Sequence, residues 1–167
     1  VKHSTPCGVA VGSSALETYK KTFECDPVSI FGGIIGMNFK VDAATAEELN
    51  KTFLEIVMAP DFDADALDIL KKKKNLRIIK IKNAVSDKQT WVKIDGGILV
   101  QDNDNQFSEN IQTVTVFKPS AQQEKALLFA QRVVKYVKSN AIVVSNGFQA
   151  LGIGGGQVNR IWATQHA

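Results

Sequence analysis

Short apolar runs alternate with helical patterns along most of this chain, and that alternation limits the possible folds more than any other feature. Residues 30–37 form a nearly continuous apolar run, which is typical of a strand buried on both faces. Apolar runs return at 54–59 and 141–144, with helical patterns between them. Strands that alternate with helices predict a three-layer α/β/α fold, in which helices cover both faces of a mixed sheet.

Capping residues and the spacing of apolar side chains mark the expected helices. They run from a cap at Ser13 or Ser14 to about Glu24, from Ala43 to about Phe53, from a cap at Asp61 or Asp63 through Lys71–Lys74, from Pro119–Ser120 to about Lys138, and onward from Gln157. The four lysines are expected in a last helical turn, where cations complement the helix dipole. No aromatic residues alternate with them, so a nucleic-acid-binding patch is the weaker interpretation.

Further strands are expected where apolar residues alternate with polar ones or where β-branched residues cluster. They cover residues 76–82, 91–94, 97–101 and 113–116, and the pair around Asp95-Gly96 is expected to form an antiparallel hairpin inserted into the fold. Residues 83–90 and 102–110 are expected to be polar connections. The long helix is expected to turn Leu127, Leu128, Ala130, Val134 and Val137 inward.

Length and composition favour one ordinary domain of a soluble protein. The chain has 167 residues, 44% of them hydrophobic and 22% charged, and its net charge of +3 is too small to indicate a polyanion-binding surface. No apolar run is long enough to span a membrane. Two cysteines, Cys7 and Cys25, are too few for a disulfide framework, which favours a reducing cytoplasm. The chain begins on its most distinctive motif and lacks an initiator methionine, so we expect a fragment.

That motif is the stretch 1–8, where a lysine and a histidine stand side by side before a proline and a glycine. Pro6 and Gly8 take the chain out of regular structure. A neutral imidazole at His3 would serve as a base and the ammonium of Lys2 as an electrostatic clamp. Neighbouring residues of an extended segment point to opposite sides, so both serve one site only if the backbone twists, as a turn at 6–8 allows. An ordinary surface Lys-His pair is the alternative.

Two other motifs are tempting and are set aside. Gly152-x-Gly154-x-Gly156 follows a strand, but its spacing departs from the dinucleotide-binding pattern G-x-G-x-x-G. Binding of an anion at the start of the following helix is physically reasonable and is kept as an interpretation. Zinc deaminases carry H-x-E and P-C-x-x-C. Here Cys7 lacks the second cysteine and no H-x-E occurs, so we expect no metal and interpret Cys7 as a packed thiol.

Four motifs together resemble one known family in the same order along the chain. They are Lys2-His3-x-x-Pro6-Cys7-Gly8, the stretch 25–33 (CDPVSIFGG), the stretch 138–141 (KSNA) and the stretch 152–160 (GIGGGQVNR). They are similar to the transformylase part of the bifunctional purine-synthesis family, AICAR transformylase/IMP cyclohydrolase. The resemblance covers nearly the whole chain and identifies residues 1–167 as the first of two copies of a cytidine-deaminase-like α/β/α subdomain, without the second copy and without the cyclohydrolase domain.

The resemblance implies formyl transfer from 10-formyltetrahydrofolate to the 5-amino group of AICAR, an aminoimidazole carboxamide ribonucleotide. It implies no metal, no nucleic acid and no membrane, and a cytoplasmic homodimer whose site is shared between subunits. The fragment alone is expected to be nearly inactive. A noncatalytic nucleotide-binding or regulatory module on the same fold is the alternative, and it would make Lys2 and His3 expendable.

The resemblance also implies roles for single residues, position by position. The catalytic set is His3 as base, Lys2 as the positive charge, and Asn140, whose amide orients the carboxamide or the formyl oxygen; the substrate-binding set is Gly32, Glu55, Arg160 and Ile161. Thr5 departs from the Asn or Ser found in relatives but leaves Lys-His intact. Purely structural alternatives remain: Gly32 as a bulge, Glu55 as a solvated carboxylate at a strand entrance, Asn140 as a helix C-cap, and Arg160 as a solvated first-turn residue.

Overall fold

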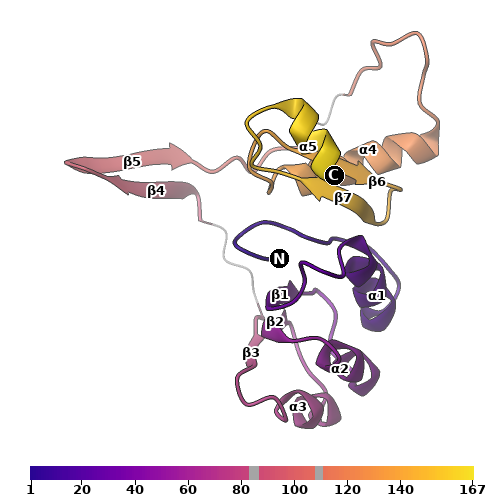
Figure 1. Cartoon of the computed structure of the whole chain (residues 1–167), viewed down its shortest axis with the longest axis vertical. Coiled ribbons are helices and arrows are strands. Elements are labelled where there is room, and N and C mark those ends of the chain that lie inside the picture. Colours follow the sequence, from indigo (N-terminus) through magenta and orange to yellow (C-terminus); the bar gives the residue numbers. More distant parts are fainter. Residues whose placement is uncertain (83–86, 108–110) are drawn as a thin grey trace.

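The structure, a computed structural model, describes residues 1–82, 87–107 and 111–167 (Figure 1). The polar connections expected over 83–90 and 102–110 therefore lie partly outside the described residues. A three-stranded parallel sheet forms the centre of the N-terminal half. Its strands are β1 (Gly33–Gly36), β2 (Leu54–Ala59) and β3 (Arg77–Lys80), and they lie in that order.

Three helices pack on this sheet: α1 (Ala15–Cys25), α2 (Ala43–Asn50) and α3 (Ala64–Leu70). Their buried side chains form one core with β1 and β2, in which Leu49, Val57 and Leu70 are at most 1% exposed. Burial of a side chain of this size contributes about 1.5–3 kcal/mol. The opposite face of the sheet is less covered, and Ile79 there is 38% exposed. In β1 itself Ile35 is buried, but its neighbours Ile34 and Gly36 are half-buried and exposed, so the expectation that residues 30–37 are buried on both faces is wrong.

A hairpin projects from the rest of the molecule (Figure 1). It pairs β4 (Gln89–Ile94) with β5 (Gly97–Asp102) in antiparallel register. Gly96 has a φ of +78°, which only glycine adopts without cost, so the Asp95-Gly96 turn predicted from the sequence is confirmed. Every residue of both strands is exposed.

The C-terminal part is a second antiparallel hairpin with a helix on each strand. β6 (Ile142–Ser145) pairs with β7 (Ala150–Gly154), α4 (Ala121–Val134) packs on β6, and α5 (Arg160–His166) packs on β7. Ser145 fixes the first contact, since its hydroxyl donates a hydrogen bond to the carbonyl oxygen of Ala126 at 2.9 Å. Within the described ranges, no helix is both long and apolar enough to cross a bilayer.

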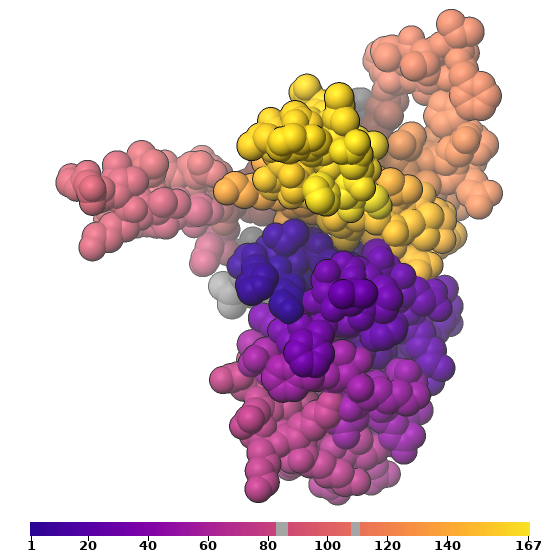
Figure 2. Space-filling view, viewed as in Figure 1, coloured from indigo at the N-terminus to yellow at the C-terminus, as the bar shows by residue number. Residues whose placement is uncertain are grey.

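The N-terminal segment joins the two halves. The amide of Ile34 in β1 donates to the carbonyl oxygen of Val1 at 2.8 Å, and the amide of Ala150 in β7 donates to that of Val9 at 2.9 Å. Figure 2 shows this segment, in indigo, between the purple N-terminal half and the yellow C-terminal part. The first residues of the chain therefore lie between the parallel sheet and the C-terminal hairpin and are hydrogen-bonded to both.

Several expectations differ from the structure. The α/β class is confirmed, but the strands of the described residues form three separate sheets in place of one mixed sheet. Residues 113–116 form no strand, and Val114 is 93% exposed, so no neighbour pairs with this segment. The lysines 71–74 follow the end of α3. The final helix begins three residues later than expected, because the Asn159 side chain caps it by accepting a hydrogen bond from the amide of Trp162 at 2.8 Å.

The inner face of the long helix also differs from the expectation. Leu127 is 60% exposed, whereas Val133 and Val137 are 5% and 7% exposed. α4 contacts β6 and the turn after it through Ala126, in the first half of the helix, and the side of the helix that carries Leu127 and Leu128 is left uncovered.

Candidate functional site

A tight turn carries the Lys-His pair. Lys2 and Thr5 exchange two backbone hydrogen bonds, of 2.8 and 2.9 Å, and the residues between them, His3 and Ser4, have φ values of +49° and +63°. Positive φ at both central positions is the pattern of a type I′ turn. The backbone therefore reverses at His3-Ser4 itself, earlier than the expected turn at 6–8. Non-glycine residues in this region cost about 1–3 kcal/mol each, and such strain clusters at functional sites.

This turn borders a cavity of about 660 Å³. The cavity is lined by residues from four segments, within 2–7, 25–29, 151–157 and 166–167. Lys2 and His3 both line it, and so does the glycine stretch at the end of β7. The structure thus brings three of the four sequence motifs, the first, the second and the last, to one cavity.

Gly32 does not line the cavity, but it lies next to Lys2, which does. The ammonium of Lys2 donates a hydrogen bond to the carbonyl oxygen of Phe31. A methyl group placed on Gly32 would lie 3.8 Å from that ammonium. The amide of Gly32, whose φ is +69°, already donates to the carbonyl oxygen of Phe53 at 2.8 Å, so its own carbonyl oxygen is the backbone group left for a ligand.

Asn140 lies behind the wall of the cavity. Its backbone exchanges two hydrogen bonds, of 3.0 and 3.3 Å, with Gln157, which lines the cavity. The C-cap of α4 is Lys135, so the interpretation of Asn140 as a helix C-cap is wrong. The position of Asn140 is fixed by the glycine loop instead.

Glu55, Arg160 and Ile161 do not line the cavity either, so Lys2 and His3 are the two predicted site residues that do. Glu55 on β2 forms an ion pair with Arg77 on β3, with 2.9 Å between the carboxylate and guanidinium atoms. Arg160 is the first residue of α5 and is exposed, and Ile161 beside it is 70% exposed. Any contact of these three with a ligand at His3 needs a larger assembly or a local rearrangement.

The second sequence motif, residues 25–33, also contributes an acidic and a thiol group to the cavity wall, although no role was predicted for either. Asp26 accepts hydrogen bonds from the amides of Val28 at 3.1 Å and Ser29 at 2.8 Å. Burial by itself would raise the pKa of this carboxyl, but the hydrogen bonds from Ser29 and Val28 outweigh it and hold the pKa below its usual range. Burial raises the pKa of the Cys25 thiol, which donates to the carbonyl oxygen of Ala150. Cys25 is therefore a neutral thiol at pH 7 and a poor nucleophile.

His166, in the last turn of α5, is a residue of the cavity wall that lies outside all four motifs. The chain contains two histidines, and both line the same cavity although 162 residues separate them. No local motif surrounds His166, so only the folded chain reveals this pairing. Within the described parts of the chain, no three His, Cys, Asp or Glu side chains lie close enough together to hold a metal ion.

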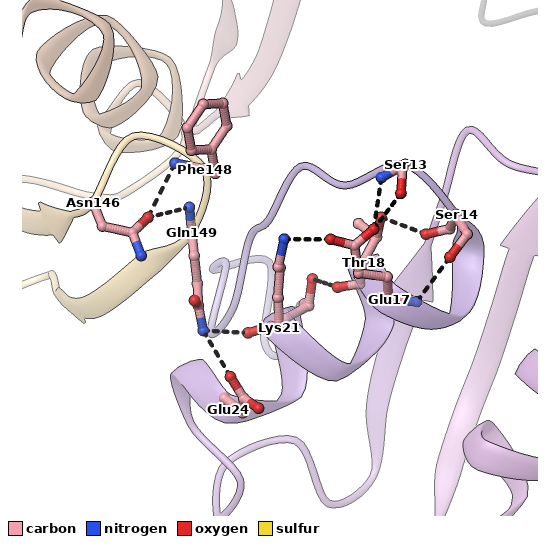
Figure 3. A network of polar contacts seen from close by, with 10 residues as sticks. Ser13, Ser14, Glu17, Thr18, Lys21, Glu24, Asn146, Phe148 and Gln149 are labelled. Carbon is pink, nitrogen blue, oxygen red and sulfur yellow. Dashed lines mark hydrogen bonds and ion pairs between the residues drawn. The ribbon is translucent and has the colours of Figure 1, made fainter. Parts of the chain in front are cut away.

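A network of polar contacts holds two walls of the cavity in place (Figure 3). The side-chain amide of Gln149, just before β7, donates to the carbonyl oxygen of Lys21 at 2.8 Å and to the Glu24 carboxylate at 3.3 Å. Asn146 fixes the turn before it by accepting from the amides of Phe148 and Gln149. The end of α1 and the start of β7 therefore keep a fixed spacing.

The same network stabilises the start of α1. Glu17 accepts from the ammonium of Lys21 at 2.6 Å and from the backbone and hydroxyl of Ser13 at 2.9 and 2.5 Å. The hydrogen bonds from Lys21 and Ser13 lower the pKa of Glu17 to about 2. The side chain of Ser14 caps the helix, as predicted, by accepting from the amide of Glu17.

Comparison with known proteins gives a consistent result. Relatives named "Bifunctional purine biosynthesis protein PurH" include those of Fusobacterium nucleatum, Clostridium botulinum (strain Kyoto) and Brachyspira hyodysenteriae, each 59% identical over all 167 residues of this chain. The alignments cover 33%, 34% and 33% of these relatives. The chain thus spans about a third of the length of the curated relatives it matches.

The family profile described as "AICARFT/IMPCHase bienzyme" matches residues 1–167, the full length of the sequence. The four motifs quoted from the sequence, the identity over the full chain and this match agree. The chain belongs to the AICARFT/IMPCHase bienzyme family.

Proposed function

We propose that this chain is the first half of the transformylase part of a bifunctional enzyme of purine (IMP) biosynthesis. In this proposal the site transfers a formyl group from 10-formyltetrahydrofolate to the 5-amino group of AICAR. Membership of the family and the names of the relatives support it. The observation that carries it furthest is the cavity on which Lys2 and His3 converge through a strained turn.

The chemistry of the transfer fits these two side chains. A C–N bond forms between the amine of AICAR and the formyl carbon, and the bond from that carbon to N10 of the folate breaks. The amine is a weak nucleophile because its lone pair is delocalised into the imidazole ring. Neutral His3 takes the proton that the amine loses, and the released folate nitrogen gains a proton. The ammonium of Lys2 stabilises the negative charge on the formyl oxygen in the tetrahedral intermediate.

The position of Lys2 suits this electrostatic role. An ammonium group carries three N–H donors, and one of them is held by the carbonyl oxygen of Phe31. That bond directs the group and leaves two donors for a ligand. Donors fixed before the reaction stabilise a developing charge without the cost of reorganisation.

The remaining roles belong to a larger assembly. We propose that Asn140 orients the carboxamide or formyl oxygen, and that Gly32, Glu55, Arg160 and Ile161 contact the nucleotide and the folate once the rest of the enzyme is present. A cytoplasmic homodimer with a shared site and a cytidine-deaminase-like subdomain complete the proposal. Because Glu55 is paired with Arg77 in this structure, substrate binding would have to compete with that ion pair.

The test replaces His3 by asparagine in a protein of the relatives' full length that carries this segment. Asparagine tolerates positive φ and lacks a basic nitrogen, so the turn is kept while the base is lost. We expect turnover to fall by about 10²–10⁴-fold with little change in AICAR affinity. Unchanged turnover would reject the base assignment. A noncatalytic nucleotide-binding module predicts instead that AICAR binds while no formyl transfer occurs in either protein.

A further inference from the structure

The Lys-His turn rests on a loop that belongs to no helix or strand. This support loop, residues 26–32, joins the end of α1 to the start of β1. The ammonium of Lys2 donates its hydrogen bond to the carbonyl oxygen of Phe31 in this loop. Just after the loop, the amide of Ile34 donates to the carbonyl oxygen of Val1 at 2.8 Å. The direction of the Lys2 ammonium therefore depends on where the support loop holds the Phe31 carbonyl group.

Asp26 fixes the first half of the support loop. One of its carboxylate oxygens accepts hydrogen bonds from the amides of Val28 at 3.1 Å and Ser29 at 2.8 Å. Pro27 has no amide proton, so the carboxylate takes the first two amides that follow it. The carbonyl oxygen of Val28 in turn accepts from the amide of Phe31 at 3.4 Å. Two successive hydrogen bonds thus connect the Asp26 side chain to Phe31.

The core and β2 fix the second half of the support loop. Ile30 is 2% exposed, and the amide of Gly32 donates to the carbonyl oxygen of Phe53 at 2.8 Å. The rings of Phe31 and Phe53 lie in contact, with 5.3 Å between their centroids. The Phe31 carbonyl group therefore lies between a second half that the core anchors and a first half whose shape depends on Asp26.

Asp26 lines the same cavity as Lys2, so a direct electrostatic role of its charge is the alternative. The ion pairs of the described residues include none between Asp26 and Lys2 or His3. The carboxylate oxygen binds amides of its own loop instead. These contacts favour a role through the backbone over a role of the charge.

We propose that Asp26 is a positioning residue: its hydrogen bonds to the support loop fix the Phe31 carbonyl group, which in turn fixes the ammonium of Lys2. The inference rests on the proposed function, in which that ammonium stabilises the negative charge on the formyl oxygen. Misplacement of a catalytic group by about 1 Å lowers a rate by up to about 10²-fold. Asp26 therefore affects the rate although it contacts no reacting atom.

The first test compares Asp26→Ala and Asp26→Asn in a protein of the relatives' full length that carries this segment. We expect Asp26→Ala to lower kcat by about 10–100-fold with little change in the KM for AICAR, because Lys2 acts on the transition state. Asparagine offers an oxygen to the same two amides without the charge, so Asp26→Asn should recover most of the loss. If Asp26→Asn is as slow as Asp26→Ala, the charge itself acts and the positioning role is overturned.

The matched control for a general loss of stability is Asp42→Ala. Asp42 is the N-cap of α2, accepts a hydrogen bond from the amide of Thr45 at 2.8 Å and does not line the cavity. Its replacement removes a similar hydrogen bond without reaching Lys2, so kcat should stay that of the parent. An equal decrease of kcat in Asp42→Ala and Asp26→Ala would overturn the proposal.

The second test asks whether Asp26 acts through Lys2. Lys2→Met removes the ammonium and keeps an unbranched side chain. In a protein that carries Lys2→Met, we expect Asp26→Ala to lower kcat by less than about twofold, because the group that Asp26 positions is absent. If Asp26→Ala has the same effect with and without Lys2→Met, the two residues act independently and the proposal is wrong.

The third test does not depend on formyl transfer. Proton–nitrogen NMR of isotope-labelled lysine in the chain measures how fast the ammonium protons exchange with water, and Lys2→Met assigns the Lys2 signal. We expect Asp26→Ala to accelerate this exchange at Lys2, and Asp26→Asn and Asp42→Ala to leave it nearly as in the parent. Equal exchange rates in Asp26→Ala and the parent would overturn the positioning of Lys2 by Asp26.

The proposed function and this inference fail in different ways. A full-length protein that transfers formyl groups equally well with Asp26→Ala would overturn the positioning role alone. A protein that transfers no formyl group, but in which Asp26→Ala accelerates exchange at the Lys2 ammonium, would overturn the proposed function and support the positioning of Lys2.

Discussion

The close packing of α5 on β7 gives the sharpest structural prediction, and Gly154→Ala tests it. A methyl group at Gly154 would lie 2.0 Å from the carbonyl oxygen of Ala163 and 2.8 Å from the amide nitrogen of Ala167. An ordinary contact is at least 3.4 Å, so α5 would have to move by more than an ångström. Both atoms belong to backbone, which cannot rotate away as the tip of a side chain does.

Overpacking of a well-packed region costs about 1–3 kcal/mol, and rigid backbone on the far side places this substitution at about 3 kcal/mol. For a chain of this size, each kcal/mol lowers the melting temperature by about 2–4 °C, so we expect a decrease of about 10 °C. Differential scanning calorimetry of parent and variant at pH 7 measures it.

The matched control is Gly36→Ala, another glycine in a strand. The nearest atom to a methyl group there is the terminal methyl carbon of Met58 at 3.7 Å, an ordinary contact. We expect a change within about 0.5 kcal/mol. If Gly154→Ala melts within a degree of Gly36→Ala, then α5 does not lie against β7 as the structure has it, and the wall of the cavity that includes His166 is misplaced.

Three further predictions follow from single contacts. Glu17→Gln should lower the melting temperature at pH 7 and make no difference near pH 2. The folded-state pKa of this carboxyl is lowered from 4.5 to about 2, so the carboxylate stabilises the fold fully above pH 4.5 and loses that effect as the pH falls to about 2. Melting of both proteins from pH 2 to pH 7 tests this, and a difference that does not change with pH would contradict it. Ser4→Gly should raise the free energy of unfolding by about 1 kcal/mol in urea titrations, since glycine accepts a φ of +63° without strain; a loss of stability would show that the turn is not strained. Gln149→Ala should cost about 1 kcal/mol in the same titrations, because the carbonyl oxygen of Lys21 loses its donor; an unchanged midpoint would remove this contact from the account.

The elements with strong local signals could be predicted from the sequence. Ser14, one of the two expected caps, caps the first helix, and the Asp95-Gly96 hairpin forms where its turn residues place it. In each of these places the deciding interaction joins residues a few positions apart. Local chemistry is therefore sufficient to predict these elements.

The arrangement of the sheets could not be predicted in the same way. Residues 113–116 have the composition of a strand, but β-propensity needs a neighbouring strand, and none of the strands in the described residues pairs with them. The apolar residues around Leu127 follow the helical period, yet their exposure depends on what α4 contacts elsewhere. Which distant segments contact these two stretches cannot be predicted from the residues of the stretches themselves.

The candidate site shows the same division. The Lys2-His3 pair stood out as a motif. The positive φ at Ser4, which turns both side chains toward one cavity, could not be predicted because glycine or asparagine, the residues typical of positive φ, does not occur there. His166 carries no motif and becomes visible only when α5 folds back on β7. Glu55 was expected at the substrate, and its ion pair with Arg77 depends on the register of two parallel strands.

The most direct test of the central claim is the crystal structure of the full-length enzyme with AICAR bound. We expect the 5-amino nitrogen to lie within about 3.2 Å of a ring nitrogen of His3, the reach of a general base, with the ammonium of Lys2 on the same side of the nucleotide. An amino group bound in another cavity, with His3 directed into solvent, would contradict it.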